Sequence, residues 1–173
     1  YYTLISLPLG DTAAEQALQM AARRGAMKWL TGQLNKVRAA RVRAKVGNLD
    51  RTLVVVESQE LLAGQKRGIA VALRKAKTEL IKLDRLVQAK RISRSSLEQR
   101  IKKTLAREHL SQFVVTSIGG DDKTPTLSWH VDAAKRHQLE NTRLGRRVLC
   151  TDQHLWSTGR IVHGFRGQWN VEE

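Results

Sequence analysis

A heptad-like run of apolar residues in the middle of the chain is the strongest constraint on its fold. Between residues 69 and 87 the apolar side chains follow at alternating steps of four and three: Ile69, Leu73, Ala76, Leu80, Leu83 and Val87. This spacing places them on one face of an α-helix, because residues three and four apart are neighbours on a helical surface. The pattern predicts a long helix that begins near Gln59 and extends about 40 Å.

A second amphipathic segment follows this helix after a short polar break. Ser95 and Glu98 have the spacing of a capping box, and Leu97, Ile101 and Leu105 lie on one helical face. Two such helices joined by a short turn predict an antiparallel helical hairpin over residues 59–111. The alternative is a coiled coil in which the seam pairs two chains, although three heptads are marginal for that purpose.

Short β-type runs flank the hairpin on both sides. They are rich in Val, Ile and Thr and are bounded by turn residues, at positions 2–7, 52–58, 112–118, 127–131 and 146–151. The segment "GGDDKTP" predicts a β-hairpin turn between the third and fourth runs. The expected fold is therefore mixed α/β, with one sheet interrupted by the helical hairpin. The expected division is 1–58 (strands and a basic helix), 59–111 (the insertion) and 112–173 (the remaining strands and a C-terminal helix).

The charge of the chain favours a polyanionic partner. The 173 residues include 31 Lys and Arg against 16 Asp and Glu, a formal charge of +15. Such an excess favours nucleic acid over an anionic membrane, and no apolar stretch reaches the length of a membrane span. The single cysteine, Cys150, excludes an internal disulfide and suits a cytoplasmic protein with a buried structural thiol.

The basic residues are concentrated in two regions. No Asp or Glu occurs between Gln16 and Leu49, and 14 basic residues face five acidic ones between Glu60 and Leu110. Either region alone is equally well explained as a solvated face, but the two together favour contact with phosphates. In the first region the candidate DNA-contacting residues are Lys36, Arg38, Arg41 and Arg43. Trp29 is either a base-stacking residue or, more often for a lone Trp, a core anchor.

The last segment of the chain is predicted to be an amphipathic helix with a distinctive face. Ser157 is a good N-cap, and at 100° per residue one face carries five residues: Ile161, Phe165, Gln168, Trp169 and Glu172. The simplest interpretation is a helix whose acidic residue lies at the edge of its apolar stripe.

The segment "RRVLCTDQHLWSTGRIVHGFRGQWNVEE" resembles the C-terminal catalytic segment of bacterial insertion-sequence transposases of the DDE class. That family's signature is Tyr-x2-Arg-x3-Glu-x6-Lys, commonly with a Trp three residues before the Glu. Phe165 stands at the Tyr position, Gln168 at the Arg position and Glu172 at the Glu position, with Trp169 in register. The absent hydroxyl and cation weaken the phosphate contacts that the family makes there. The resemblance is more specific over residues 146–173 than over 53–118.

This resemblance implies a partial RNase H-like sheet with an insertion and an enzyme that cleaves and joins DNA. It implies two Mg²⁺ (or Mn²⁺) ions held by three carboxylates, of which Glu172 would be the third and a metal ligand. Phe165, Arg166, Gln168 and Trp169 become candidate DNA contacts. The implied partners are transposon ends and target DNA, with a possible homodimer in a synaptic complex, in the bacterial cytoplasm at the nucleoid.

The first two catalytic aspartates are not evident in the chain. Asp152 directly follows a strand, but in this family Thr followed by Asn or Asp commonly occurs there without being catalytic. Both aspartates are expected upstream of Tyr1, so that the chain is an internal piece and inactive alone. The alternative is a non-catalytic, basic nucleic-acid-binding module.

Overall fold

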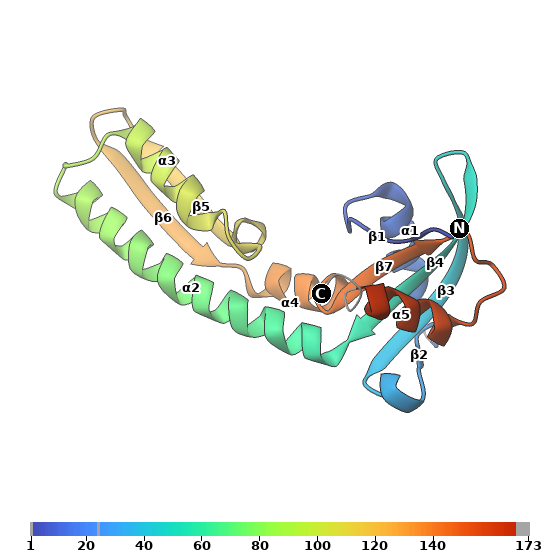
Figure 1. The fold of residues 1–173 in the computed structure, drawn as a ribbon. Helices are drawn as coiled ribbons and strands as arrows, with labels where there is room; N and C mark the ends of the chain where they lie inside the picture. Colours follow the sequence, from blue (N-terminus) through green and yellow to red (C-terminus); the bar gives the residue numbers. More distant parts are fainter. Residues whose placement is uncertain (1, 24, 169–173) are drawn as a thin grey trace. The chain divides into compact units, whose positions relative to one another are not determined.

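The chain forms two compact units, described here from a computed structural model that covers residues 2–23 and 25–168. The first unit comprises Tyr1–Ala63 and Thr142–Glu173, and the second comprises Gly64–Asn141. Both units contain helices and strands, so the predicted mixed α/β class is confirmed (Figure 1). The RNase H-like part of that expectation stays a prediction.

The first unit is built on a five-stranded sheet in which all neighbouring strands are antiparallel. Its strand order is β1-β7-β4-β3-β2. The strands are β1 (Leu4–Leu7), β2 (Lys28–Trp29), β3 (Val37–Val46), β4 (Leu49–Ser58) and β7 (Arg146–Thr151). Strand β7 pairs with β1 on one side and β4 on the other, so segments from both ends of the chain complete one sheet. This confirms the predicted interruption of a single sheet for these strands.

Two helices cover opposite faces of this sheet. Helix α1 (Thr12–Ala21) packs with Leu53 and Val55 of β4, and helix α5 (Thr158–Gly167) packs with Val54 and Val56 of the same strand. Side chains alternate between the faces of a strand, so this uninterrupted apolar run is buried on both sides. Figure 1 shows α1 and α5 on either side of the sheet.

The last part of the first basic region is a strand, so the basic helix expected within residues 1–58 does not include it. Residues 37–46 form β3, which pairs along its whole length with β4. In "VRAARVRAK" basic residues repeatedly alternate with small apolar ones, a two-residue period that suits a half-buried strand. Gly47 (φ 62°) begins the two-residue turn to β4, where a positive φ favours glycine. The 3₁₀ helix η1 (Gly32–Leu34) precedes β3.

The second unit contains the predicted helical hairpin. Helix α2 (Gln59–Gln88) buries Ile69, Leu73, Ala76, Leu80 and Leu83, and α3 (Arg94–Leu105) buries Leu97, Ile101 and Leu105. Residues from the middle of α2 and from the end of α3 and the turn after it line one groove, so α3 runs back along α2 as an antiparallel pair requires (Figure 1). The seam is therefore covered within the unit, which removes the main reason for a coiled-coil dimer. Among the described residues, no helix has both the length and the apolar character needed to cross a membrane.

The prediction that residues 112–131 join the core sheet is wrong. Strands β5 (Val114–Gly120) and β6 (Pro125–Val131) form a separate two-stranded sheet in the second unit, between η2 (Leu110–Gln112) and α4 (Ala133–Thr142). Val114, Thr116 and Ile118 line a pocket with Ile101 and Leu105 of α3. Because the helical hairpin supplies an apolar surface of its own, these strands are partly buried without the core sheet. The predicted β-hairpin turn between them is confirmed.

The residues that precede the helices test the two helix caps predicted above, of which one is wrong and one is confirmed. At the start of α1, the carboxylate of Asp11 accepts the N–H groups of Ala13 and Ala14. Ser93, rather than Ser95, precedes α3. Ser157 caps α5 as predicted, because its Oγ accepts the N–H of Arg160 at 3.2 Å.

Candidate nucleic-acid interface

Helix α5, which carries the predicted catalytic motif, is fixed on the core sheet. Its first turn is capped by Ser157, and Ile161 and Val162 are buried against Leu4 and Leu149. Phe165 is half-buried at the edge of the same core, and the Nε2 of Gln168 donates to the carbonyl of Leu4 at 3.3 Å. The helix thus docks through the apolar face that the sequence predicted.

The predicted catalytic and metal-binding residue, Glu172, lies outside the described residues, as does Trp169. Among the described residues, no three His, Cys, Asp or Glu side chains converge on a point where a metal ion could be held. These residues alone therefore do not fit a two-metal centre.

A cavity of about 220 Å³ lies beside α5 in the first unit. Phe165 and Arg166 line it with Arg147 of β7, whose guanidinium carbon is 6.0 Å from the centre of the Phe165 ring. Val56 and Val162 are among the apolar residues that complete the lining. Two guanidinium groups beside an apolar floor could bind one small anionic group, such as a phosphate. Arg147 was not predicted, although the alternation along β7 places it on the same face as Leu149.

The four basic residues predicted from the first region do not form one patch. Lys36 makes an exposed ion pair with Glu60 at 3.5 Å, and Arg38 pairs with the buried Glu57. Arg41 donates to backbone carbonyls of the loop before α5. Arg43 is exposed and has no hydrogen bond or ion pair with a described residue. Of the four, Arg43 is therefore the one whose charge is most available to a partner.

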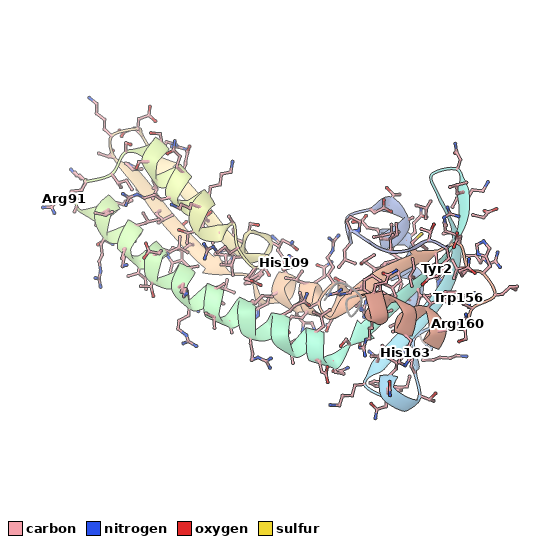
Figure 2. All side chains as sticks on the ribbon, viewed as in Figure 1. Tyr2, Arg91, His109, Trp156, Arg160 and His163 are labelled. Carbon is pink, nitrogen blue, oxygen red and sulfur yellow. The ribbon has the colours of Figure 1, made fainter. Side chains whose placement is uncertain are left out.

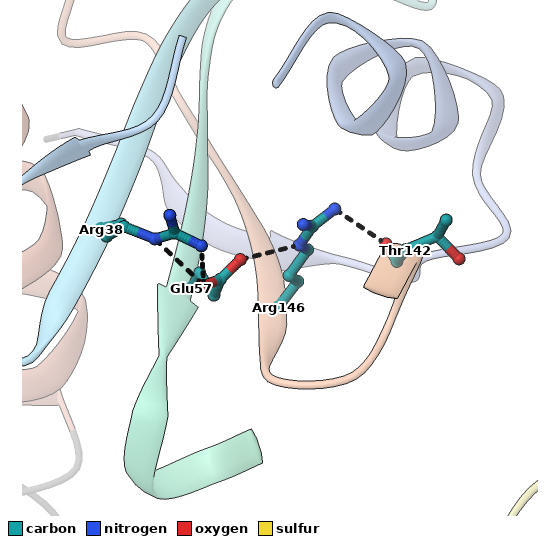
Figure 3. Close-up of polar contacts among 4 residues, drawn as sticks. All are labelled: Arg38, Glu57, Thr142 and Arg146. Atoms are coloured by element: carbon teal, nitrogen blue, oxygen red, sulfur yellow. Dashed lines mark hydrogen bonds and ion pairs between the residues drawn. The ribbon is translucent and has the colours of Figure 1, made fainter. Parts of the chain in front are cut away.

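Glu57 of β4 links the neighbouring strands β3 and β7 through a buried ion cluster (Figure 3). Its Oε1 accepts from Arg38 (Nη2 2.5 Å, Nε 3.1 Å), and its Oε2 accepts from Nε of Arg146 at 3.2 Å. Arg146 also donates to the carbonyl of Thr142 at 3.2 Å. The side chains of Glu57 and Arg146 are only 7% and 13% exposed. Arg38 and Arg146 are thus engaged in holding the sheet together.

Trp29 is not a core anchor. Its side chain is exposed on the edge strand β2, with the guanidinium of Arg38 5.4 Å from the ring centre. This separation is within the range of a cation–π contact. The ring remains available for stacking on a base, which was the other interpretation of its sequence position.

The contacts of Asp152 and the burial of Cys150 are those of residues with a structural role. Asp152 Oδ1 accepts the N–H of Thr3 at 3.0 Å and the side-chain amide of Gln153 at 3.1 Å. The hydrogen bond from Thr3 is the main reason that the pKa of Asp152 lies below the ordinary aspartate value. Burial raises the pKa of the Cys150 thiol, as expected for a structural cysteine.

The second unit carries a groove between α2 and α3 of about 560 Å³. Four exposed cations line it: Arg67 and Lys75 from α2, Lys103 from α3, and Arg107 just after the end of α3. It also contains Glu79, which is paired with Lys82 at 2.7 Å, and Glu108. The groove has no aromatic residue, so its chemistry suits a phosphate backbone rather than stacked bases.

Comparisons of the chain with protein-family models, with curated proteins and with solved structures find no match.

Proposed function

We propose that this chain is part of a DNA transposase of the DDE class, which cleaves and joins DNA at the ends of an insertion sequence. The observation that carries the proposal is the run of strand β7, a short ordered loop and the Ser157-capped helix α5, with Phe165 and Gln168 at the family's spacing. The remaining motif positions, Trp169 and Glu172, rest on the sequence alone.

In this proposal the reaction needs three carboxylates that hold divalent metal ions. When bound, Mg²⁺ would stabilise the charge on the attacking and leaving oxygens of the phosphodiester. Glu172 would supply one carboxylate. The other two would come from aspartates that are not evident in residues 1–173, so the chain alone is expected to be inactive.

The test is to express the complete open reading frame that encodes this chain and to incubate it with DNA of the flanking element ends. The proposal expects Mg²⁺-dependent nicks at those ends, and none from residues 1–173 alone. A complete reading frame without two further acidic residues on core strands would contradict the proposal, as would a protein that binds these ends but never nicks them.

A second candidate is a nucleic-acid-binding module without catalysis, and the cationic groove of the second unit favours it. Duplex binding by this groove is also compatible with a transposase. Metal-dependent cleavage by the complete protein separates the two candidates, because the binding module requires none.

Neutralising the groove is expected to weaken duplex binding more than removing the same charge elsewhere. The variant Arg67→Gln/Lys75→Gln/Lys103→Gln/Arg107→Gln should bind at least about tenfold more weakly. Its plot of log affinity against log salt concentration should be shallower by about 2 to 4, because each lost phosphate contact removes about one unit of slope. Fluorescence anisotropy over a salt series measures both quantities.

The matched control removes four exposed cations of the same two helices that do not line the groove: Arg74, Lys77, Arg85 and Arg100. Both variants have the same net charge. Equal weakening by the two variants would show that binding follows net charge alone and that the groove has no special part in it.

A further inference from the structure

The loop between β7 and α5 presents a leucine that is almost fully exposed. The side chain of Leu155 is 98% exposed, whereas the other large exposed apolar residues of the described chain are between 40% and 57% exposed. Single exposed apolar residues are common on protein surfaces. Leu155 differs from them because the backbone on both sides of it is held in place.

Contacts from several strands hold this loop. One guanidinium, that of Arg41 on β3, donates to the carbonyls of both His154 and Trp156, the two neighbours of Leu155. Nδ1 of His154 is 2.9 Å from the hydroxyl of the buried Thr52 on β4. Asp152, at the start of the loop, accepts the N–H of Thr3 next to β1. The loop is thus fixed to β3, to β4 and to the residue that precedes β1.

The residue after Leu155 is held by its side chain as well. The Trp156 ring lies 4.9 Å from the Tyr2 ring, between centroids, and the Arg160 guanidinium is 4.3 Å from the Trp156 ring centre. Figure 2 labels these three residues, which come from the N-terminal segment, the loop and α5. Because these contacts fix the loop, the exposed side chain of Leu155 is held in a defined position in which a partner could bind it.

Cations on the same side of the first unit indicate the chemistry of that partner. Arg43 and Lys45 follow Arg41 at two-residue steps along β3, so all three lie on the face that α5 covers. Arg160 adds a further exposed guanidinium beside the loop. The one acidic side chain in the loop, Asp152, is engaged by the N–H of Thr3. An apolar tip flanked by cations matches the surface of proteins that insert a side chain into duplex DNA.

We infer that Leu155 is a wedge that enters duplex DNA between neighbouring base pairs, while Arg43 and Arg160 contact the phosphates on either side. The inference rests on the proposed function for the identity of the partner. Because the loop is ordered by the protein itself, binding does not have to order it, and more of the contact energy remains available to separate the bases.

The test uses the full chain and a duplex of about 30 base pairs with 2-aminopurine placed at several TA steps, which unstack most readily. Unstacking raises the fluorescence of this base. Wild-type protein is expected to raise the signal, and Leu155→Ala to lose at least about two-thirds of the rise with affinity only a few-fold lower. The salt dependence of binding should not change, because no phosphate contact is lost.

Two further variants separate the wedge from general effects. Met20→Ala removes an exposed apolar side chain on α1, which covers the opposite face of the sheet, and should keep the full fluorescence rise. Arg43→Gln, which removes a proposed phosphate contact but none of the contacts that hold the loop, should lower the salt slope by about 1, whereas Leu155→Ala leaves that slope unchanged.

The wedge is overturned if the wild-type chain binds DNA without a fluorescence rise, if Leu155→Ala keeps the rise, or if the chain binds no DNA. A change in sedimentation on Leu155→Ala without a change in fluorescence would mean that the tip docks on protein, which also overturns it. If the DNA is unstacked but the complete protein shows no Glu172-dependent cleavage, the wedge proposal is supported and the transposase proposal is contradicted. If the complete protein cleaves DNA but does not unstack it, the transposase proposal is supported and the wedge proposal is contradicted.

Discussion

Replacing Glu172 by glutamine in the complete protein is expected to reduce Mg²⁺-dependent nicking of element ends by about a thousand-fold, which corresponds to about 4 kcal/mol of transition-state stabilisation. The substitution keeps the size of the side chain but removes a negative charge from the metal centre proposed above. Weakened metal binding and weakened stabilisation of the reacting oxygens both lower the rate. Gel analysis of end-labelled duplexes at saturating Mg²⁺ measures the effect.

The chain provides a matched control for this substitution. Glu173 is the immediate neighbour of Glu172 and has the same side chain, but the family spacing from Phe165 and Gln168 selects Glu172. Glu173→Gln should therefore leave cleavage within about twofold of wild type, a barrier change of only a few tenths of a kcal/mol. Equal losses of cleavage rate from the two substitutions, or an active Glu172→Gln protein, would contradict the assignment of Glu172 to the glutamate position of the motif.

Replacing Glu57 by glutamine is expected to destabilise the first unit by about 3 kcal/mol. The substitution leaves the guanidinium of Arg146, only 13% exposed, without the charge that neutralises it. Breaking a buried ion pair by removing one partner is costly because the remaining charge stays desolvated. A urea titration followed by tryptophan fluorescence measures the change in the free energy of unfolding.

Glu60→Gln is the control for this result. Glu60 pairs with Lys36 at 3.5 Å, but both side chains are at least 70% exposed, so this pair contributes no more than about 0.5 kcal/mol. A Glu57→Gln protein as stable as the Glu60→Gln protein would show that the cluster in Figure 3 does not stabilise the sheet.

Parts of the fold that depend on local pattern could be predicted from the sequence. The seam from Ile69 to Leu83 gave the long helix because burial of one helical face requires that period. Ser157 correctly predicted the start of α5, because a serine hydroxyl can accept a free N–H group of the first helical turn. The strand over residues 37–46 was not predicted, because its charge carries no information about secondary structure and only the two-residue alternation of apolar and basic side chains indicates a strand.

The sheet partners could not be predicted in the same way. Whether β5 and β6 join the core sheet depends on which surface covers their apolar side, and that surface is α3. The strand patterns of residues 114–131 and 146–151 give no sign that the two segments belong to different sheets. Local sequence specifies that a strand forms, whereas its neighbours are determined by tertiary packing.

Of the cavity beside α5 and the loop around Leu155, the sequence predicted only the residues that a single helix brings together. Phe165 and Arg166 lie at one cavity as a shared helix suggests, but Arg147 joins them only because β7 lies beside α5. The surroundings of Leu155 depend on Tyr2 and Arg41, which are more than 110 residues away in the sequence. No local motif reports contacts of that separation.

The position of β7 in the sheet has a consequence for the order in which the chain acquires structure on the ribosome. Among the described strands, β1 pairs only with β7, and β7 is synthesised after the whole of the second unit. The second unit is one continuous segment, so it can fold as soon as it leaves the exit tunnel, whereas β1 must wait unpaired for more than a hundred residues of translation. Truncated chains that end before residue 146 and are released from the ribosome should accordingly show protection from protease in residues 64–141 but not at β1.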